Sequence, residues 1–356
     1  PTTMSKRVLI TGGAGLIGSN FVHHWCKNYD GRVVVLDILG YAGNKANVAD
    51  LSSQDRFRLV QGDICDGALV ASIVAEEEID TVVHFAAESH VDRSILGPAA
   101  FVQTNVVGTF TLLEAFRNWW NAKDQPNDYR FLHVSTDEVY GSLEADDPAF
   151  TETTSYAPNS PYSASKAGSD HLARAYFHTY GMPTLITNCS NNYGPFQFPE
   201  KLIPLMCLNI LLGKPLPVYG DGQNVRDWLH VSDHCSAIDV VLHQAQPGDV
   251  YNIGGNNQVK NIDIVHSLCD LMGELAGDLP TPPRDLITFV TDRPGHDRRY
   301  AMDISKIQQD LGWSPAYHFE KGLRQTVEWY LTNRDWWQAL LSAEYKGYYD
   351  SLYGDR

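Results

Sequence analysis

The stretch RVLITGGAGLIG, from Arg7 to Gly18, carries the strongest fold signal in the chain. An apolar run typical of a buried strand comes first. Gly12, Gly15 and Gly18 follow at a spacing of three residues, and a helical pattern then continues to about Asn28. A strand, a glycine-rich turn and a helix in this order are typical of a dinucleotide-binding unit.

Short apolar strands alternate with helical patterns through the first half of the chain. The predicted strands are 7–11, 32–37, 57–61, 81–86, 131–135 and 183–187, and the predicted helices after the first are 67–78, 98–118 and 162–180. This alternation indicates parallel βαβ units. We therefore predict an α/β protein with a Rossmann-type, doubly wound parallel sheet, whose ligands bind at the carboxyl ends of the strands.

The composition of the sequence changes after about residue 188, where Gly, Pro and Asn become more frequent. We predict an NAD-binding domain over 1–188 and a smaller C-terminal α/β lobe, mainly for substrate binding, over 189–356. Later segments, at about 226–245 and 298–305, are expected to return to the first domain. The end of the chain, 329–353, is rich in Trp and Tyr, which favours packing over a binding site.

The glycines have separate expected tasks: a tight turn, close approach of a diphosphate, and packing of the helix on the sheet. Asp37 ends the second predicted strand, where a carboxylate accepts hydrogen bonds from ribose and repels a 2′-phosphate. Its neighbour Ile38 is not an arginine, which favours NAD over NADP. Asp63 follows the third strand and is placed to reach the adenine. The expected cofactor contacts are Gly12, Gly15, Leu16, Ile17, Gly18, Asp37, Asp63, Ile64, Ala86, Ala87, Tyr162 and Lys166.

Tyr162 and Lys166 are four residues apart in a predicted helix, so they share one face. A close ammonium group lowers the pKa of a phenol, and a nearby NAD⁺ adds to this effect. Combined with the glycine motif, the pair is predicted to abstract a proton from a hydroxyl group.

Thr136, Asp137 and Glu138 follow the strand predicted at 131–135, at the ligand edge of the sheet. Two adjacent carboxylates can acquire different pKa values, so that one donates a proton while the other accepts one. A solvent-facing acidic loop or a helix N-cap explains the local sequence equally well.

Composition narrows the classes of partner. Acidic residues outnumber basic ones by 43 to 27, giving a formal net charge of −16. Nucleic acid and membrane surfaces are therefore not expected partners. The six cysteines form no C-x-x-C pair and no zinc-binding pattern, so we expect buried thiols and no metal. The sequence shows neither a signal peptide nor a membrane-spanning apolar run, and we predict a cytoplasmic protein.

Together these motifs resemble the extended short-chain dehydrogenase/reductase family, in its sugar-nucleotide dehydratase branch. The resemblance rests on 12–18, 135–141 and Tyr162/Lys166, and it extends through 41–44, 86–94, 189–195, 199–204, 222–228 and 293–297. Asp137 and Glu138 distinguish a dehydratase from the related epimerases, which have small or neutral residues at these positions. The segment 38–40 departs from the more polar family pattern, on the cofactor side.

The resemblance implies a reaction. The expected substrate is dTDP-glucose, and the expected products are dTDP-4-keto-6-deoxyglucose and water. Tyr162, helped by Thr136, would take the proton of the C4 hydroxyl while hydride moves to NAD. Glu138 would remove the C5 proton, Asp137 would protonate the departing C6 hydroxyl, and hydride would return to C6.

The resemblance also implies substrate contacts and a partner. Arg226 is the first candidate for the diphosphate, and Tyr219 for stacking on the base. His90 ranks low as a catalyst. Members of this family usually form homodimers, here through helices near 100–118 and 162–180. The expected substrate contacts are Ser89, His90, Thr136, Asn191, Lys201, Leu202, Tyr219, Arg226, Asn261, Arg293 and His296.

Two alternatives stay open. One is another NAD-dependent sugar-nucleotide enzyme, either a UDP-, CDP- or GDP-sugar 4,6-dehydratase or a 4-epimerase. The other is a non-catalytic dinucleotide-binding regulator, which would have no need of the acid–base pair. The motifs alone do not distinguish thymidine from uridine.

Overall fold

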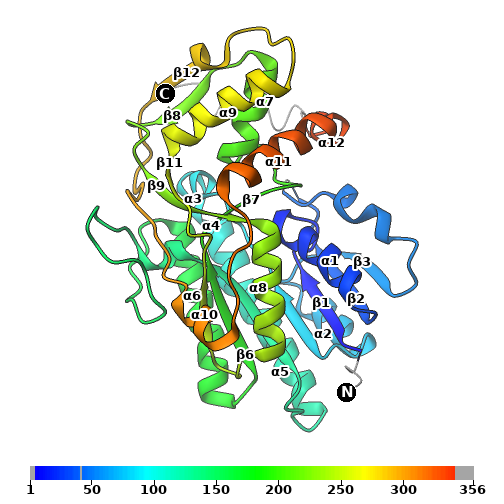
Figure 1. The fold of residues 1–356 in the computed structure, drawn as a ribbon. Coiled ribbons are helices and arrows are strands. Elements are labelled where there is room, and N and C mark those ends of the chain that lie inside the picture. The colour runs from blue at the N-terminus through cyan, green and yellow to red at the C-terminus, as the bar shows by residue number, and fades with distance from the viewer. Residues whose placement is uncertain (1–4, 41, 341–356) are drawn as a thin grey trace.

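The computed structural model describes residues 5–40 and 42–340, and its centre is a seven-stranded sheet in which every neighbouring pair is parallel (Figure 1). The strand order is β10-β6-β5-β4-β1-β2-β3, so the order reverses between β1 and β4. This confirms the predicted doubly wound sheet. The strands are β1 (Arg7–Thr11), β2 (Arg32–Asp37), β3 (Phe57–Gln61), β4 (Thr81–His84), β5 (Arg130–Thr136), β6 (Thr184–Cys189) and β10 (Val250–Ile253).

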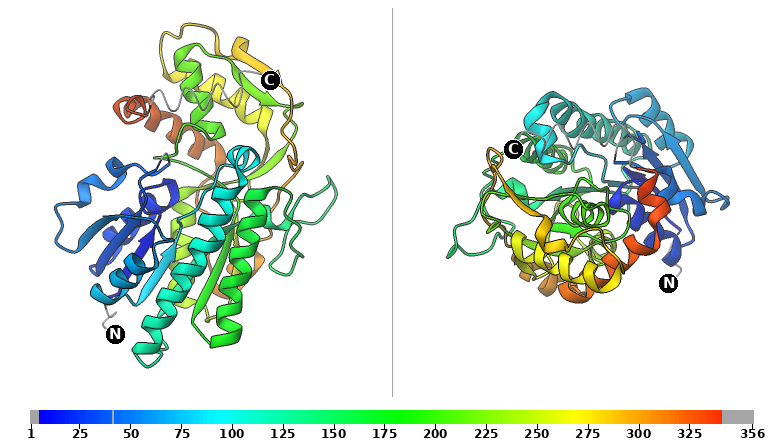
Figure 2. Two further views of the ribbon diagram at one scale, coloured as in Figure 1. Left: turned by 180° about the vertical axis from the view of Figure 1, so that it is seen from behind. Right: turned by 90° about the horizontal axis from the view of Figure 1, so that it is seen from above.

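Helices cover both faces of this sheet, and each face has its own hydrophobic core. On one face α1 (Leu16–Asn28) packs against α8 (Val231–Gln244), and α10 (Ser305–Leu311) lies beside them. The opposite face is covered by α2 (Gly67–Glu76), α5 (Thr109–Ala122) and α6 (Pro161–Tyr180), as the view from behind shows (Figure 2). Burial of apolar side chains on both faces explains why the strands read as nearly continuous apolar runs.

The helix predicted over 98–118 is interrupted. It consists of α4 (Pro98–Phe101), a π-helical turn η2 (Val102–Gly108) and α5, and it is preceded by α3 (Val91–Leu96). The buried amide of Asn105 lies in the π-helical turn, where it exchanges two hydrogen bonds of 2.9 Å with the backbone of Glu88 and donates to Ser165 Oγ. These tertiary bonds provide a reason for the local change of helix type.

A smaller lobe lies beyond the carboxyl edge of the main sheet. It contains the sheet β11-β9-β7 and the parallel pair β12-β8, packed with α7, α9 and α11 around a third core. The bounds of these elements are β7 (Asn191–Tyr193), β8 (Leu216–Tyr219), β9 (Val225–His230), β11 (Gln258–Lys260), β12 (Ile287–Val290), α7 (Leu202–Leu212), α9 (Asn261–Leu275), α11 (Phe319–Thr332) and α12 (Arg334–Gln338). The 3₁₀ turns of the chain are η1 (Lys45–Leu51) after β2, η3 (Asp137–Tyr140) after β5 and η4 (Pro283–Leu286) before β12.

The chain passes between the two parts more than once. After β9, helix α8 returns to the main sheet, and β10 adds the strand beside β6. Met302 pairs with Phe150, and Tyr300 to Met302 lie in the core of that same face. The division at residue 188 stays a prediction.

The structure also tests the expectations for the cysteines, for membrane-spanning helices and for the aromatic-rich end of the chain. Five of the six free cysteines are buried, but Cys65 is partly exposed, so the expectation of six buried thiols is wrong for that residue. Among the described residues, no helix is long and apolar enough to cross a membrane. Tyr330 and Trp337 pack against α7, while 341–353 of the aromatic-rich end lie outside the described residues.

Candidate active site

A cavity of about 350 Å³ opens at the carboxyl edge of the main sheet. It is lined by the residues that follow β1 to β6 and by 197–201, just before α7. Every predicted cofactor contact lines this cavity. So do Ser89, Asn191, Lys201 and the run from Thr136 to Glu138.

The glycine-rich turn fits a diphosphate. Gly12 has a φ of +69°, and a Cβ there would lie 2.7 Å from the backbone nitrogen of Ala86. A Cβ on Gly18 would lie 2.1 Å from the carbonyl oxygen of Gly12, so both of these glycines are required by the fold itself. Gly15 is different, because the nearest atom to its Cβ would be 3.5 Å away. Gly15 also begins α1 without a side-chain cap, which leaves backbone N–H groups for an anion.

Asp37 is buried at the end of β2, where its carboxylate accepts hydrogen bonds from the N–H groups of Ala14 (3.0 Å) and Leu39 (2.8 Å). Burial raises the pKa of Asp37, and these two bonds partly offset the shift. The bonds fix the carboxylate on the cavity wall, with lone pairs left to accept from a ribose hydroxyl.

Helix α6 carries Tyr162 and Lys166 near its N-terminus. Ser160 and Ser163 form a capping box, and Pro161 occupies the first turn. Tyr162 and Lys166 are both buried, but the Lys166 Nζ atom donates to the Val134 carbonyl oxygen at 2.9 Å.

Burial raises the pKa of Tyr162 well above its ordinary value, and the negative charge of Glu138 adds to the shift. A hydrogen bond involving Thr136 acts in the opposite direction. Desolvation of the phenolate is the largest cause of the Tyr162 pKa shift in the protein chain alone. The lowering of this pKa by the Lys166 ammonium together with a bound NAD⁺ stays a prediction.

The two carboxylates are not a solvent-facing loop. Asp137 is 1% exposed, and its Oδ2 atom has no hydrogen-bond partner within the described chain. Burial raises the pKa of Asp137 well above its usual value, with a further contribution from Glu138. The N-cap of η3 is supplied by Thr136, whose Oγ1 accepts from the Glu138 N–H at 3.2 Å.

Glu138 has different surroundings. Burial raises its pKa, but the positive charges of Arg293, Arg226 and Lys201 oppose the shift. The pKa of Glu138 is still raised overall, but that of Asp137 is raised well above its usual value, so Asp137 holds its proton more strongly. This is the arrangement that an acid–base pair of carboxyl groups requires.

The cations around Glu138 come from separate elements. Arg226 lies on β9, with its guanidinium 4.2 Å from the centre of the Tyr300 ring. Arg293 forms an ion pair with Asp92 at 3.5 Å. Lys201, just before α7, donates to the Ser89 carbonyl oxygen at 3.1 Å. This local positive charge opposes the acidic background of the whole chain.

Three further predicted substrate contacts, Tyr219, Asn261 and His296, belong to the smaller lobe. Tyr219 donates to Asp92 at 2.7 Å, and its ring meets His296 edge-on at 5.7 Å. Burial lowers the pKa of His296 to about 4, and Arg293 adds to the effect. Asn261 begins α9, with its Oδ1 atom buried and unpaired among the described residues.

Seven of the eleven predicted substrate contacts are not among the residues that line this cavity: Tyr219, Arg226, Asn261, Arg293 and His296, which are described above, and His90 and Leu202. His90 is buried and caps α3, accepting a hydrogen bond from the Arg93 N–H at 3.3 Å. Leu202 begins α7 and packs against the core of the lobe. A structural task accounts for His90 and for Leu202.

Sequence reasoning missed Tyr300 and Asp170. Tyr300 reaches Glu138 Oε1 at 3.4 Å and also bonds Asp297. No local pattern signals this, because Tyr300 is 162 residues from Glu138. Asp170 carried a usable signal, since it lies one turn after Lys166 in α6.

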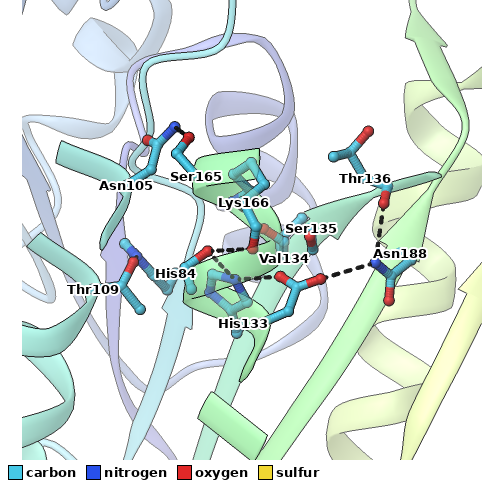
Figure 3. A network of polar contacts seen from close by, with 12 residues as sticks. His84, Asn105, Thr109, His133, Val134, Ser135, Thr136, Ser165, Lys166 and Asn188 are labelled. Carbon is cyan, nitrogen blue, oxygen red and sulfur yellow. Dashed lines mark hydrogen bonds and ion pairs between the residues drawn. The ribbon is translucent and has the colours of Figure 1, made fainter. Parts of the chain in front are cut away.

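Asp170 is the hub of a buried polar network, and Figure 3 shows His133, Asn188 and Thr136, which belong to it. Its carboxylate accepts from His133 (2.9 Å), Tyr156 (2.8 Å) and Asn188 (3.2 Å). Asn188 also donates to the Thr136 carbonyl oxygen at 3.0 Å. Burial by itself would raise the pKa of Asp170, but the hydrogen bond from His133 and other favourable interactions lower it overall. The network ties α6 to the end of β5, which carries the acidic pair.

Comparison with known proteins identifies the class. Residues 9–326 match a family model described as GDP-mannose 4,6 dehydratase. The chain is 58% identical over 341 residues to the dTDP-glucose 4,6-dehydratase of Xanthomonas campestris pv. campestris strain B100, covering 95% of this chain and 97% of that protein. It is 54% identical over 360 residues to dTDP-glucose 4,6-dehydratase 1 of Escherichia coli K12, covering 98% and 99%.

A solved structure agrees. The dTDP-glucose 4,6-dehydratase DesIV of Streptomyces venezuelae, with NAD and TYD bound, superposes with a TM-score of 0.85 at 48% identity, covering 94% of this chain and 99% of that one. The chain therefore belongs to the dTDP-glucose 4,6-dehydratase family.

We predict that Asp170→Asn lowers the free energy of unfolding by about 1–3 kcal/mol, because the amide nitrogen cannot accept the hydrogen bonds that the carboxylate accepts. Asp310→Asn is the control, since Asp310 is exposed and its carboxylate accepts a hydrogen bond from the Tyr251 hydroxyl. Urea unfolding of both variants measures the difference. Equal stabilities would contradict the assignment of Asp170 as a structural hub.

Proposed function

We propose that this chain converts dTDP-glucose to dTDP-4-keto-6-deoxyglucose and water, with an NAD that is regenerated in each turnover. The observation that carries the proposal is the position of buried Asp137 and half-buried Glu138 beside buried Tyr162, with the pKa of Asp137 raised well above its usual value and the rise at Glu138 opposed by three cations. The high identity to named dTDP-glucose 4,6-dehydratases supports it.

The first step is removal of the proton from the C4 hydroxyl. NAD⁺, when bound, supplies a hydride acceptor for C4, a hydride donor for C6 and a positive charge close to the phenol of Tyr162. Tyr162 accepts the hydroxyl proton, and Thr136 orients the hydroxyl beside it. Lys166 places its ammonium group in the same buried region and favours the phenolate.

Elimination of water needs a base and an acid. The ketone at C4 acidifies the C5 hydrogen, and ionised Glu138 removes that proton. Protonated Asp137 gives its proton to the C6 hydroxyl, which leaves as water. After hydride returns to C6, a proton is restored at C5 and the sugar is a 4-keto-6-deoxyhexose.

Other residues of the site are proposed to bind the substrate. Arg226, Arg293 and Lys201 offer positive charge to the diphosphate. Tyr219 and His296 offer ring faces and edges to the base. Asn191, Asn261 and Ser89 offer polar contacts to the nucleotide and the sugar. We propose that residues 1–188 mainly bind NAD and residues 189–356 mainly bind the nucleotide sugar.

The alternatives differ in what they require of the acidic pair. A 4-epimerase and a non-catalytic regulator need no buried acid beside a carboxylate base, so Asp137 and Glu138 favour dehydration over both. The choice of thymidine over uridine, cytidine or guanosine rests on the relatives.

The decisive experiment incubates the purified protein with dTDP-glucose and no added NAD⁺, then measures the absorbance of a 4-keto sugar in alkali. Product is expected, because the cofactor returns to its starting state in each cycle. UDP-glucose tested in parallel checks the base preference. No product from dTDP-glucose, even after NAD⁺ is supplied, would overturn the substrate assignment.

Glu138→Gln should reduce solvent-deuterium exchange at C5 by about 100- to 10,000-fold, because the general base is lost. Asp137→Asn is the matched control: it should keep C5 exchange but slow the loss of water. Mass spectrometry and NMR of the recovered sugar measure both. Unchanged exchange in Glu138→Gln would assign the base to another residue.

Gly15→Ala should leave stability close to that of the parent and weaken NAD binding by roughly 5- to 150-fold, since the added methyl group occupies diphosphate space at a cost of about 1–3 kcal/mol. Gly18→Ala should instead destabilise the fold, because its Cβ would overlap the Gly12 carbonyl oxygen. Calorimetric titration and thermal unfolding separate the two effects. Tight NAD binding by Gly15→Ala would contradict the proposed cradle.

We also propose a homodimer. Leu96, Val102, Val107 and Phe110 are exposed along α3, η2 and α5, with exposed fractions from 37% to 64%, and Tyr180 at the end of α6 is 43% exposed. An apolar set of this kind on adjacent helices suits a second copy of the chain. A cytoplasmic location stays a prediction.

Phe110→Asp should convert the dimer to a monomer, because a carboxylate would be buried in the interface. Phe289→Asp is the control, since Phe289 is 57% exposed on β12 in the smaller lobe. Light scattering during gel filtration gives the mass of each species. A monomeric parent protein would contradict the proposal.

A further inference from the structure

The last described helix, α12, contacts the segment that supports the glycine-rich turn. The Trp336 Nε1 atom donates to Asn47 Oδ1 at 2.6 Å, across 289 residues of sequence. Figure 1 shows α12 close to the segment that follows β2. The C-terminal part of the chain therefore reaches the cofactor side of the cavity.

Asn47 relays this contact to the turn itself. It is 1% exposed, and its Nδ2 atom donates to the Ala14 carbonyl oxygen at 2.8 Å. The same oxygen accepts from the Asn44 N–H at 3.0 Å, and the Ala14 N–H donates to Asp37. Ala14 lies between Gly13 and Gly15, so these bonds hold the turn on which the diphosphate is proposed to rest.

The indole of Trp336 determines how the Asn47 amide is oriented. An indole N–H only donates, so it selects the oxygen of the amide and directs the nitrogen toward Ala14. The reverse orientation would place the amide oxygen of Asn47 against the Ala14 carbonyl oxygen. Loss of the indole N–H would therefore weaken the support of the turn without altering any residue that lines the cavity.

The same helix supports a second wall of the cavity. Phe196 has a φ of +69°, a strained value for a residue with a side chain. Its ring packs against Trp329 at 5.2 Å and Trp336 at 6.2 Å. Gln197, the next residue, lines the cavity. Trp336 thus connects the cofactor turn with the segment leading to Lys201.

We propose that Trp336 is a positioning residue that holds the glycine-rich turn in its NAD-binding form and slows release of the cofactor. The proposal rests on the proposed function in one respect, that NAD is the cofactor. A reaction that returns its hydride to the same sugar gains from a cofactor that stays bound between turnovers. Preorganising the turn reduces the ordering that binding would otherwise require.

Trp336→Phe tests the proposal, because it keeps the aromatic packing and removes only the indole donor. The NAD-loaded protein is diluted, and dissociation of NAD is followed by rapid gel filtration and nucleotide assay. Release should be about two- to twelvefold faster than in the parent, the range that one hydrogen bond supplies. The melting temperature and kcat at saturating NAD⁺ should stay close to parental values.

Trp119→Phe is the matched control. Trp119 is also partly buried and donates one indole hydrogen bond, to the Ile79 carbonyl oxygen at 2.8 Å, on the opposite face of the main sheet. NAD release from this variant should equal that of the parent. Parental release from Trp336→Phe, or equally fast release from both variants, would overturn the proposal.

The readout separates this proposal from the proposed function, because NAD release is measured without turnover. A chain that binds NAD but forms no 4-keto sugar would contradict the dehydratase assignment and still allow the Trp336 test. A parent protein that does not bind NAD would overturn both.

Discussion

The site depends on a balance between desolvation and positive charge around two adjacent carboxyl groups, one buried and one half-buried. Asp137 and Glu138 are adjacent in sequence, and burial raises the pKa of both. Arg226, Arg293 and Lys201 reach Glu138 from three separate segments and oppose the shift there. Neighbours that share one backbone turn therefore acquire different acidities. Without the arginines from the smaller lobe, the pKa of Glu138 would rise further, and less of the proposed base would be ionised.

The architecture brings these charges together through the topology of the sheet. Its carboxyl edge gathers the ends of six strands around one cavity, so residues far apart in sequence meet there. Behind this edge Asp170 joins β5, β6 and α6 through buried hydrogen bonds. The network is not fully satisfied, because His133 Nδ1 and Asn188 Oδ1 are buried without a hydrogen-bond partner among the described residues.

The sequence predicts those features that local pattern controls. The bounds of β1, β2 and β3 follow from apolar runs ended by polar residues, and the tasks of Gly12 and Gly18 follow from their spacing. Tertiary contacts control the rest. The π-helical turn depends on Asn105 meeting Glu88 and Ser165, and four-residue β10 gives no periodic signal. The raised pKa of Tyr162 follows from burial, which no spacing of residues reveals.

The path of β10 has a consequence for how the protein is made. This strand completes the main sheet next to β6, and α8 covers one face of it, yet both follow several elements of the smaller lobe in the sequence. A ribosome must therefore release about 250 residues before the seven strands can assemble. The seven-stranded sheet is thus complete only after the elements β7, β8 and β9 of the smaller lobe have been made. A nascent chain ending at residue 188 would present β6 as an uncovered edge, open to pairing with other chains.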